Sequence, residues 1–189
     1  MVRRELRGPR RSSPPSLRAE FDHLAPAFRA AAQAAAKAYD RVGVRYALIG
    51  GVAAGAYSQP RATKDVDFLV GDEAFDSIGA VISFRSGIPL EAHGVPIDSI
   101  PMSVEYPEIY KLVLASAIED EDESIRIALP GMVAVTKLVS GRHRDITTVV
   151  DMMRAETINL RELEQIVAPH EKLRTALARA LREYDDQED

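Results

Sequence analysis

The chain has 189 residues, of which 46% are hydrophobic and 28% charged, and its formal net charge at pH 7 is −5. This profile is typical of a globular protein with one domain, or one domain and a small extension, and it excludes collagen-like and wholly disordered chains. The sequence has no cysteine, which excludes disulfide bonds and thiol catalysis, and its net negative charge argues against a protein that coats nucleic acid.

Residues 1–17 form a basic arm in which five arginines precede Ser12-Ser13-Pro14-Pro15, a composition typical of disordered segments. No apolar region follows the arginines, so the arm does not resemble a secretory signal. The chain also has no run of the ~20 apolar residues that a membrane-spanning helix requires. We therefore expect a cytoplasmic protein without a membrane partner.

Patterns of helix and strand alternate over residues 18–130, which we expect to form the core. Apolar residues at helical spacing predict helices over 20–41, 52–57, 72–84 and 107–116. Short apolar or alternating runs predict strands over 45–49, 64–70, 88–92, 95–100 and 125–129. The acidic run 119–123 predicts a solvated loop.

The turn His93-Gly94 between two strand patterns predicts a β-hairpin, so the sheet should be mixed rather than purely parallel. From residue 131 onward every pattern is helical, and we expect a helical C-terminal region over 131–189 that packs on the core. Its helices are predicted over 131–140, 144–154, 160–167 and 170–184. The fold class is therefore α/β or α+β, with a mixed sheet and flanking helices.

Two features near the first strands point to phosphate and metal chemistry. Gly50-Gly51 stands between a strand and a helix, where the backbone can approach a ligand closely and helix N–H groups can bind phosphate. Asp65 and Asp67 lie two residues apart on a strand and therefore point to the same face. Such a pair repels by about 3 kcal/mol at a separation of ~5 Å, and a divalent cation between the two would relieve it.

The order of these features resembles the signature of nucleotidyltransferases related to DNA polymerase beta. That signature is a hydrophobic residue with a glycine pair, a spacer, and an Asp-hydrophobic-Asp-hydrophobic strand. Here Ile49-Gly50-Gly51 is followed by thirteen residues and then by Asp65-Val66-Asp67-Phe68. The resemblance covers roughly residues 44–155. It implies that the glycines hold a nucleoside triphosphate such as ATP and that the aspartates bind two ions, Mg²⁺ or Mn²⁺.

The resemblance also implies a third carboxylate from a later strand. We expect it to be Asp98, which lies among β-forming residues in Val95–Ile100, with Glu91 and Glu105 as competitors. Asp65, Asp67 and Asp98 are thus the expected catalytic and metal-binding residues. Asp98 would also be the base for the attacking hydroxyl.

Several cations and a hydroxyl are candidate phosphate contacts. The form Arg61-x-Thr63-x-Asp65 resembles the branch that includes abortive-infection toxins, which implies that Arg61 and Thr63 lie at the nucleotide. The same branch has a Lys-Leu pair in a later helix, matched here by Lys137, and then a basic and acidic run. In that run Arg142 and Arg144 are further phosphate candidates, with Asp145 and Asp151 expected to orient these cations. Solvated arginines remain an equal alternative for Arg61, Arg142 and Arg144.

The expected activity is transfer of a nucleoside monophosphate from a nucleoside triphosphate to an acceptor hydroxyl, with release of pyrophosphate. The resemblance suggests a toxin of a toxin–antitoxin pair that modifies transfer RNA or protein. A small-molecule acceptor, as in aminoglycoside nucleotidyltransferases, is the alternative enzyme. A degenerate module that binds nucleotide without turnover is the alternative from another class. The sequence leaves open an antitoxin partner and a homodimer.

Overall fold

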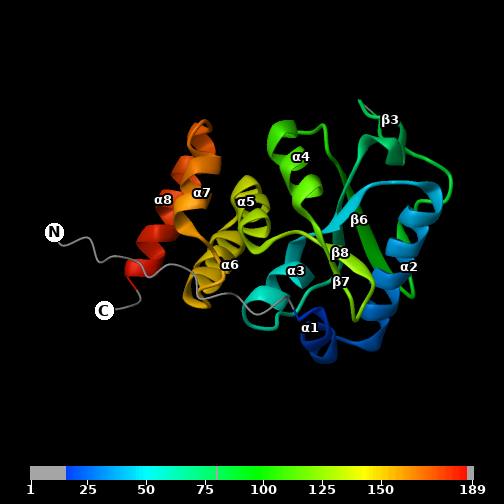
Figure 1. Ribbon diagram of the computed structural model, residues 1–189, viewed down its shortest axis with the longest axis horizontal. Coiled ribbons are helices and arrows are strands. Elements are labelled where there is room, and N and C mark those ends of the chain that lie inside the picture. The colour runs from blue at the N-terminus through cyan, green and yellow to red at the C-terminus, as the bar shows by residue number, and fades with distance from the viewer. Residues whose placement is uncertain (1–15, 80, 187–189) are drawn as a thin grey trace.

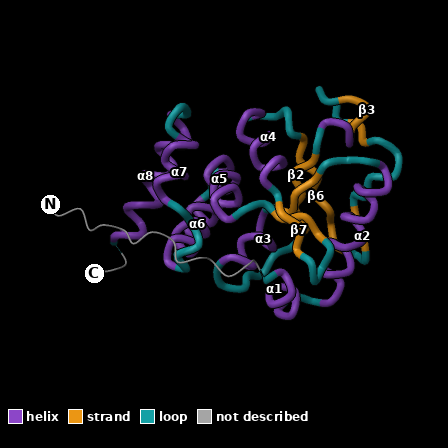
Figure 2. The backbone as a smooth tube through the Cα atoms, viewed as in Figure 1, coloured by secondary structure: helices purple, strands orange, loops and turns teal. Residues whose placement is uncertain are grey.

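A computed structural model describes residues 16–79 and 81–186 of the chain. Six strands form one sheet in the order β5-β6-β2-β1-β8-β7 (Figures 1 and 2). These strands are β1 Tyr46–Leu48, β2 Val66–Val70, β5 Glu91–Ala92, β6 Val95–Pro101, β7 Ile118–Asp120 and β8 Ile125–Ile127. The β1–β8 and β2–β6 pairs are parallel and the other three are antiparallel, so the expected mixed sheet is confirmed.

Eight α-helices accompany the sheet in the described part of the chain (Figure 1). They are α1 Leu17–His23, α2 Pro26–Val42, α3 Gly50–Tyr57, α4 Pro107–Ser116, α5 Pro130–Ser140, α6 His143–Arg154, α7 Leu160–Val167 and α8 Glu171–Asp185. Proline in the first turn begins α2, α4 and α5, because a helix start needs no N–H donor there. The helices predicted over 107–116 and from residue 131 onward are confirmed to within one residue.

The two faces of the sheet have different covers, with α2 on one face and α3 and α4 on the other. On the α2 face, the ring of Phe68 from β2 meets that of Tyr39 edge to face, with centroids 5.2 Å apart. The Tyr39 hydroxyl also lies 2.7 Å from Oγ of Ser99 in β6. Side chains alternate along a strand. Asp67 directly precedes Phe68, and Asp98 directly precedes Ser99, so both aspartates point to the opposite, α3 face.

The first predicted helix is divided in the structure. The expected helix over 20–41 is replaced by α1 and α2, because Pro26 disfavours the helical conformation at Ala25, which has φ −59° and ψ 141°. Leu17, expected at the end of the basic arm, is the first residue of α1 and is fully buried. Residues 1–15 of that arm lie outside the described part of the chain.

The helix predicted over 72–84 is wrong. A 3₁₀ turn over Asp72–Ala74 leads into a hairpin of β3 Phe75–Ser77 and β4 Ser83–Phe84, which form a separate two-stranded sheet. The apolar spacing fits a helix, but the rings of Phe75 and Phe84 pack across the hairpin with centroids 5.0 Å apart. Ile78 and Ile82, expected on a buried helix face, are exposed near the hairpin tip.

The acidic run 119–123 is only partly the solvated loop that its composition predicts. Asp120 belongs to β7 and is buried, as is the side chain of Glu123. Glu123 accepts a hydrogen bond from Gln33 at 3.0 Å and pairs with Arg29 at 3.3 Å, both on α2. Glu123 therefore holds the end of the sheet against α2, because buried carboxylates need such partners. Asp120 accepts a hydrogen bond from the backbone N–H of Glu123 at 3.0 Å and so supports the turn.

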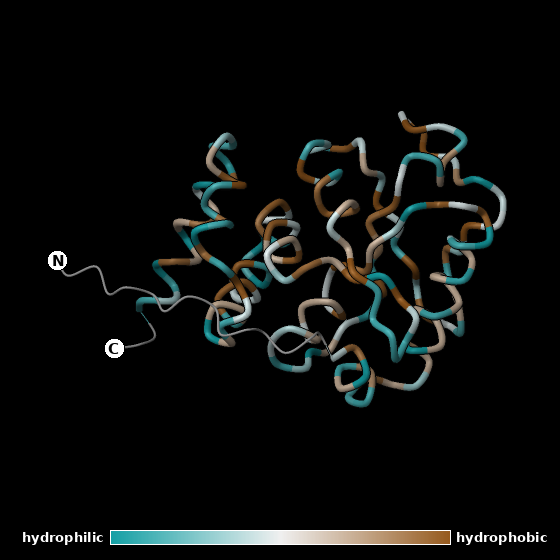
Figure 3. Tube along the Cα trace, in the orientation of Figure 1, coloured by the Kyte–Doolittle hydropathy of each residue, from teal (hydrophilic) through white to brown (hydrophobic). Residues whose placement is uncertain are grey.

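The C-terminal helices extend the α3 side of the molecule. Helix α5 contacts α3 and α4, and α6, α7 and α8 pack around α5. Figure 3 shows hydrophobic stretches concentrated along the central strands and α5, while α8 alternates hydrophobic and hydrophilic residues. None of the described helices combines the length and the apolar character needed to cross a bilayer.

A buried carboxyl group joins α1 to α3. Glu20 is 1% exposed, and its side chain packs so closely on α3 that a Cβ at Gly55 would overlap the carboxyl. One oxygen accepts a weak hydrogen bond from the Arg61 N–H at 3.4 Å, and the other has no partner in the described structure. Burial raises the pKa of Glu20 to about 6, despite this bond and nearby positive charge. The folded protein therefore shifts the ionisation equilibrium of Glu20 toward the neutral acid.

This pKa predicts a pH-dependent effect of Glu20→Gln on stability. A folded-state pKa above the unfolded value means that stability is lost as pH rises from the unfolded pKa through about 6. The loss amounts to about 2 kcal/mol, and a glutamine does not incur it. Urea unfolding should show Glu20→Gln more stable than the parent at pH 7.5 and not at pH 4.5. The exposed Glu164→Gln is the control, and an equal effect of Glu20→Gln at both pH values would contradict the argument.

Candidate active site

Three aspartates from two neighbouring strands meet on the α3 face of the sheet. Asp65 directly precedes β2, Asp67 lies within it, and Asp98 lies opposite Asp67 in the parallel register of β2 and β6. One carboxylate oxygen from each of the three lies within 4.8 Å of the others. The structure thus brings together the trio expected from the sequence, and the competitors Glu91 and Glu105 are not part of it.

The glycine pair forms the wall next to this trio. Gly50 begins α3 directly after β1 and has φ +71°, a conformation that favours glycine. A Cβ at this position would overlap the Asp67 carboxylate, so the close approach also requires glycine. The backbone N–H of Gly51 is close enough to that carboxylate to lower its pKa. The first turn of α3 therefore faces the aspartates directly.

The trio concentrates negative charge where water is partly excluded. Burial raises the pKa of Asp67 to about 6, and the carboxylates of Asp65 and Asp98 add to the effect, while Lys137 and the Gly51 N–H oppose it. The proximity of Lys137 matters, because it places one cation from α5 within electrostatic reach of the carboxylates. The remaining repulsion favours a bound cation or a proton at Asp67.

A threonine positions one of the three carboxylates. The Thr63 hydroxyl lies 3.1 Å from Oδ1 of Asp65 and 3.2 Å from its backbone oxygen, and it donates to these acceptors. The same side chain packs against the Cα of Gly51, where a Cβ would be only 3.0 Å from Oγ1. Thr63, expected at the nucleotide, therefore contacts Asp65 and fills the space between that residue and the glycine turn.

These side chains fit a divalent metal ion. The donors are all carboxylate oxygens, the ligands that Mg²⁺ and Mn²⁺ prefer, and Asp98 is exposed so that the site opens to solvent. Three carboxylates this close repel one another by about 3 kcal/mol per pair at an effective dielectric near 20. The raised pKa of Asp67, due first to burial and then to Asp65 and Asp98, agrees with a site that favours a bound cation.

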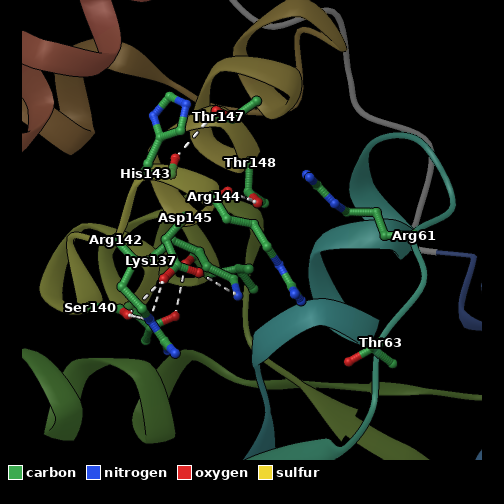
Figure 4. Close-up of polar contacts among 12 residues, drawn as sticks. Arg61, Thr63, Lys137, Ser140, Arg142, His143, Arg144, Asp145, Thr147 and Thr148 are labelled. Carbon is green, nitrogen blue, oxygen red and sulfur yellow. Dashed lines mark hydrogen bonds and ion pairs between the residues drawn. The ribbon is translucent and has the colours of Figure 1, made fainter.

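A second polar cluster lies where α5 ends and α6 begins (Figure 4). The buried carboxylate of Asp145 accepts hydrogen bonds from Lys137 at 3.1 Å, Ser140 at 2.7 Å and Arg142 at 3.0 Å. Burial alone would raise the pKa of Asp145, but Ser140 and the two cations outweigh it and lower that pKa. Asp145 therefore orients Lys137 and Arg142, as the sequence suggested, and the Arg142 side chain is 80% exposed.

Arg61, from the segment before β2, pairs with an aspartate of the C-terminal helices. Arg61 donates to Asp151 of α6 at 3.1 Å, so Asp151 pairs with Arg61 rather than with Arg142 or Arg144. In Figure 4 the Arg61 side chain extends toward α6, and that of Arg144 extends from α6 toward α3. Arg61 thus links the segment before β2 to the C-terminal helices.

Two further residues shape this region and were not among the predicted site residues. Ser140 makes the shortest hydrogen bond to Asp145, and Glu20 supports the segment that carries Arg61. Ser140 lies just before Gly141, where a helix end could be predicted, so its position three residues from Lys137 was a usable signal. Glu20 had no such signal, because its partners lie 35 and 41 residues further along the chain.

Comparison with known proteins gives a structural relative. No protein-family model matches the sequence, and no curated protein matches it. Among solved structures, the fold is similar to that of an antigenic nucleotidyltransferase-like protein from Paracoccidioides brasiliensis, with a TM-score of 0.54. The match covers 86% of this chain and 90% of that one at 16% sequence identity. At this identity the similarity establishes a shared fold.

Proposed function

We propose that this protein is a metal-dependent nucleotidyltransferase. The observation that carries the proposal is the meeting of Asp65, Asp67 and Asp98 within 4.8 Å, beside a glycine turn at the start of α3. The similarity of the fold to a nucleotidyltransferase-like protein supports it. The expected reaction moves a nucleoside monophosphate from a nucleoside triphosphate to an acceptor hydroxyl.

The three aspartates have distinct roles in the proposed reaction. The acceptor oxygen attacks the α-phosphorus, the bond from that phosphorus to the bridging oxygen breaks, and pyrophosphate leaves with the bond electrons. Asp98 is the exposed carboxylate, so an acceptor hydroxyl can reach it and lose its proton to it. Bound divalent ions would supply charge neutralisation at the reacting phosphate, and Asp65, Asp67 and Asp98 would hold them.

The cations and the helix turn form the proposed triphosphate site. Free N–H groups in the first turn of α3 suit phosphate oxygens, and that of Gly51 lies near the Asp67 carboxylate. Lys137 is held by Asp145 within reach of the trio, and the exposed Arg142 is available beside it. Arg61 acts from the other side, positioned by Asp151. Positioned cations of this kind stabilise charge that develops during phosphoryl transfer.

For the acceptor we propose RNA or protein, as the resemblance to abortive-infection toxins implies. The test is label transfer from each of the four α-labelled nucleoside triphosphates, with Mg²⁺ or Mn²⁺. Transfer RNA, cell protein, the protein itself and an aminoglycoside are the acceptors. Label on one acceptor class, lost in Asp65→Asn/Asp67→Asn, is the expected result.

A matched control distinguishes loss of the aspartate site from a general change in the charge of the protein. Asp76→Asn/Asp122→Asn removes the same two charges from exposed positions outside the trio and should transfer label normally. Label on the aminoglycoside alone would move the acceptor to the small-molecule class. No transfer to any acceptor, with nucleotide binding retained, would overturn the enzyme and favour a binding module.

A further inference from the structure

A cavity of about 380 Å³ lies among the C-terminal helices. One wall is a face of α8, and the others are Glu105 and Tyr106 ahead of α4, the end of α5 and the start of α6. Its volume falls within the range of small-molecule sites. None of the residues assigned above to the metal or triphosphate sites lines it, so it is a separate feature of the chain.

The inner part of the cavity is apolar and aromatic. Leu138, Ile146 and Leu173 are all buried and line it. The ring of Tyr106 stands in the wall and is held edge-on by His170, with ring centroids 5.1 Å apart. An apolar floor with a fixed aromatic ring suits a flat ring system, which can pack or stack there.

The outer part of the cavity is cationic. Lys172, Arg179 and Arg182 line it at intervals of seven and three residues along α8, and so share one face over about 15 Å. Arg179 lies 3.0 Å from Nδ1 of His143, whereas Lys172 and Arg182 have no ion-pair partner among residues 16–79 and 81–186. Unpaired cations around a cavity favour an anion.

Glu105 is the single carboxylate in the lining. It holds a backbone φ of +46°, which is uncommon for a residue other than glycine. Its carboxylate offers an acceptor for N–H or O–H groups of a ligand. An aromatic wall, one acceptor and three cations together match a ring compound that carries donors and a phosphate.

We propose that this cavity binds a nucleoside phosphate, at a site distinct from the three aspartates and independent of divalent metal. The ring would lie against Tyr106 and the apolar floor, and the phosphate would bind the α8 cations. The turn between α5 and α6 separates the two sites: Leu138 and Ile146 face the cavity, while Lys137 and Asp145 belong to the polar cluster. The inference does not depend on the proposed enzyme activity.

Calorimetry in EDTA tests the proposal, with AMP, adenosine, inorganic phosphate and a single-stranded oligoribonucleotide as probes. We expect AMP to bind with a Kd of about 1 mM or below, and more tightly than adenosine or phosphate. Arg179→Gln/Arg182→Gln should weaken AMP binding at least about tenfold, because charge-assisted bonds to the phosphate are lost. Ala176→Phe, which fills the cavity without changing charge, should also abolish it.

Two controls make the result specific. Arg161→Gln/Lys37→Gln removes two exposed cations elsewhere and should bind AMP like the parent. Asp65→Asn/Asp67→Asn should also bind AMP, because the cavity contains none of the three aspartates. The cavity proposal is therefore tested separately from the proposed enzyme activity. No AMP binding in EDTA, or equal loss in Asp65→Asn/Asp67→Asn, overturns the proposal. If the oligoribonucleotide binds and AMP does not, or if phosphate binds as tightly as AMP, the proposed ligand class is wrong. Circular dichroism confirms that each variant is folded.

Discussion

Replacing Asp67 with asparagine should abolish activity and make the metal-free protein more stable. The carboxylate is one of three that would hold metal, and losing several kcal/mol of transition-state stabilisation lowers the rate on the order of 10³-fold. In the metal-free protein the same carboxylate is partly desolvated and repelled by Asp65 and Asp98, as its raised pKa shows. Removing its charge should therefore raise the free energy of unfolding by about 1–2 kcal/mol, after allowance for solvent screening.

Label transfer and urea unfolding in EDTA check the two halves of this prediction. Asparagine has nearly the shape of aspartate, and its amide oxygen can face the Gly51 N–H, so the local backbone should keep its conformation. Asp76→Asn, at an exposed position of β3, is the matched control and should change neither quantity. A destabilised Asp67→Asn would mean that the carboxylate contributes to folding rather than opposing it. Such a result would remove the main electrostatic argument for a metal site.

Replacing Gly50 with alanine should damage both stability and activity. The new side chain must adopt φ near +71°, which costs about 1–3 kcal/mol for a residue other than glycine. Its Cβ would also overlap the Asp67 carboxylate, so that group or the first turn of α3 must move. A displacement of about 1 Å at a reacting centre lowers the rate on the order of 10²-fold.

Gly94→Ala separates the cost of the backbone conformation from the cost of the overlap with Asp67. Gly94 lies in the β5–β6 turn with φ +74°, and a Cβ there has no heavy atom within 4 Å. It therefore carries the backbone cost alone and should leave activity unchanged. Thermal unfolding and label transfer of both variants give the comparison. Equal destabilisation by the two, with activity retained in Gly50→Ala, would show that the contact between the glycine turn and Asp67 is not required.

The aspartate trio was predictable because each step follows from local geometry. Residues two apart on a strand share a face, which relates Asp65 to Asp67. Only the pairing of β2 with β6 is non-local, and the apolar neighbours of Asp98 in Val95–Pro101 marked a strand that could supply it. The spacing of the glycine pair from Asp65 likewise reflects one strand–helix–strand unit that is contiguous in sequence.

The errors arose where distant contacts override local pattern. Phe75, Ile78 and Ile82 have helical spacing, yet the Phe75–Phe84 contact across a hairpin determines the structure. The burial of Glu123 depends on α2, about ninety residues away in sequence, which a run of acids cannot indicate. The Arg61–Asp151 pair is equally distant, so the sequence could nominate both residues without relating them.

The parallel register of β2 and β6 has a consequence for folding. A slip of β6 by one residue along β2 would turn Asp98 to the α2 face, away from Asp65 and Asp67. An ion held by all three carboxylates would bind the correctly paired chain and not the slipped one, and mass action would then stabilise that pairing in proportion to RT ln(1 + [ion]/Kd). Ion binding would thus select the correct register of β2 and β6 during folding, because a chain with the slipped register has no complete ion site.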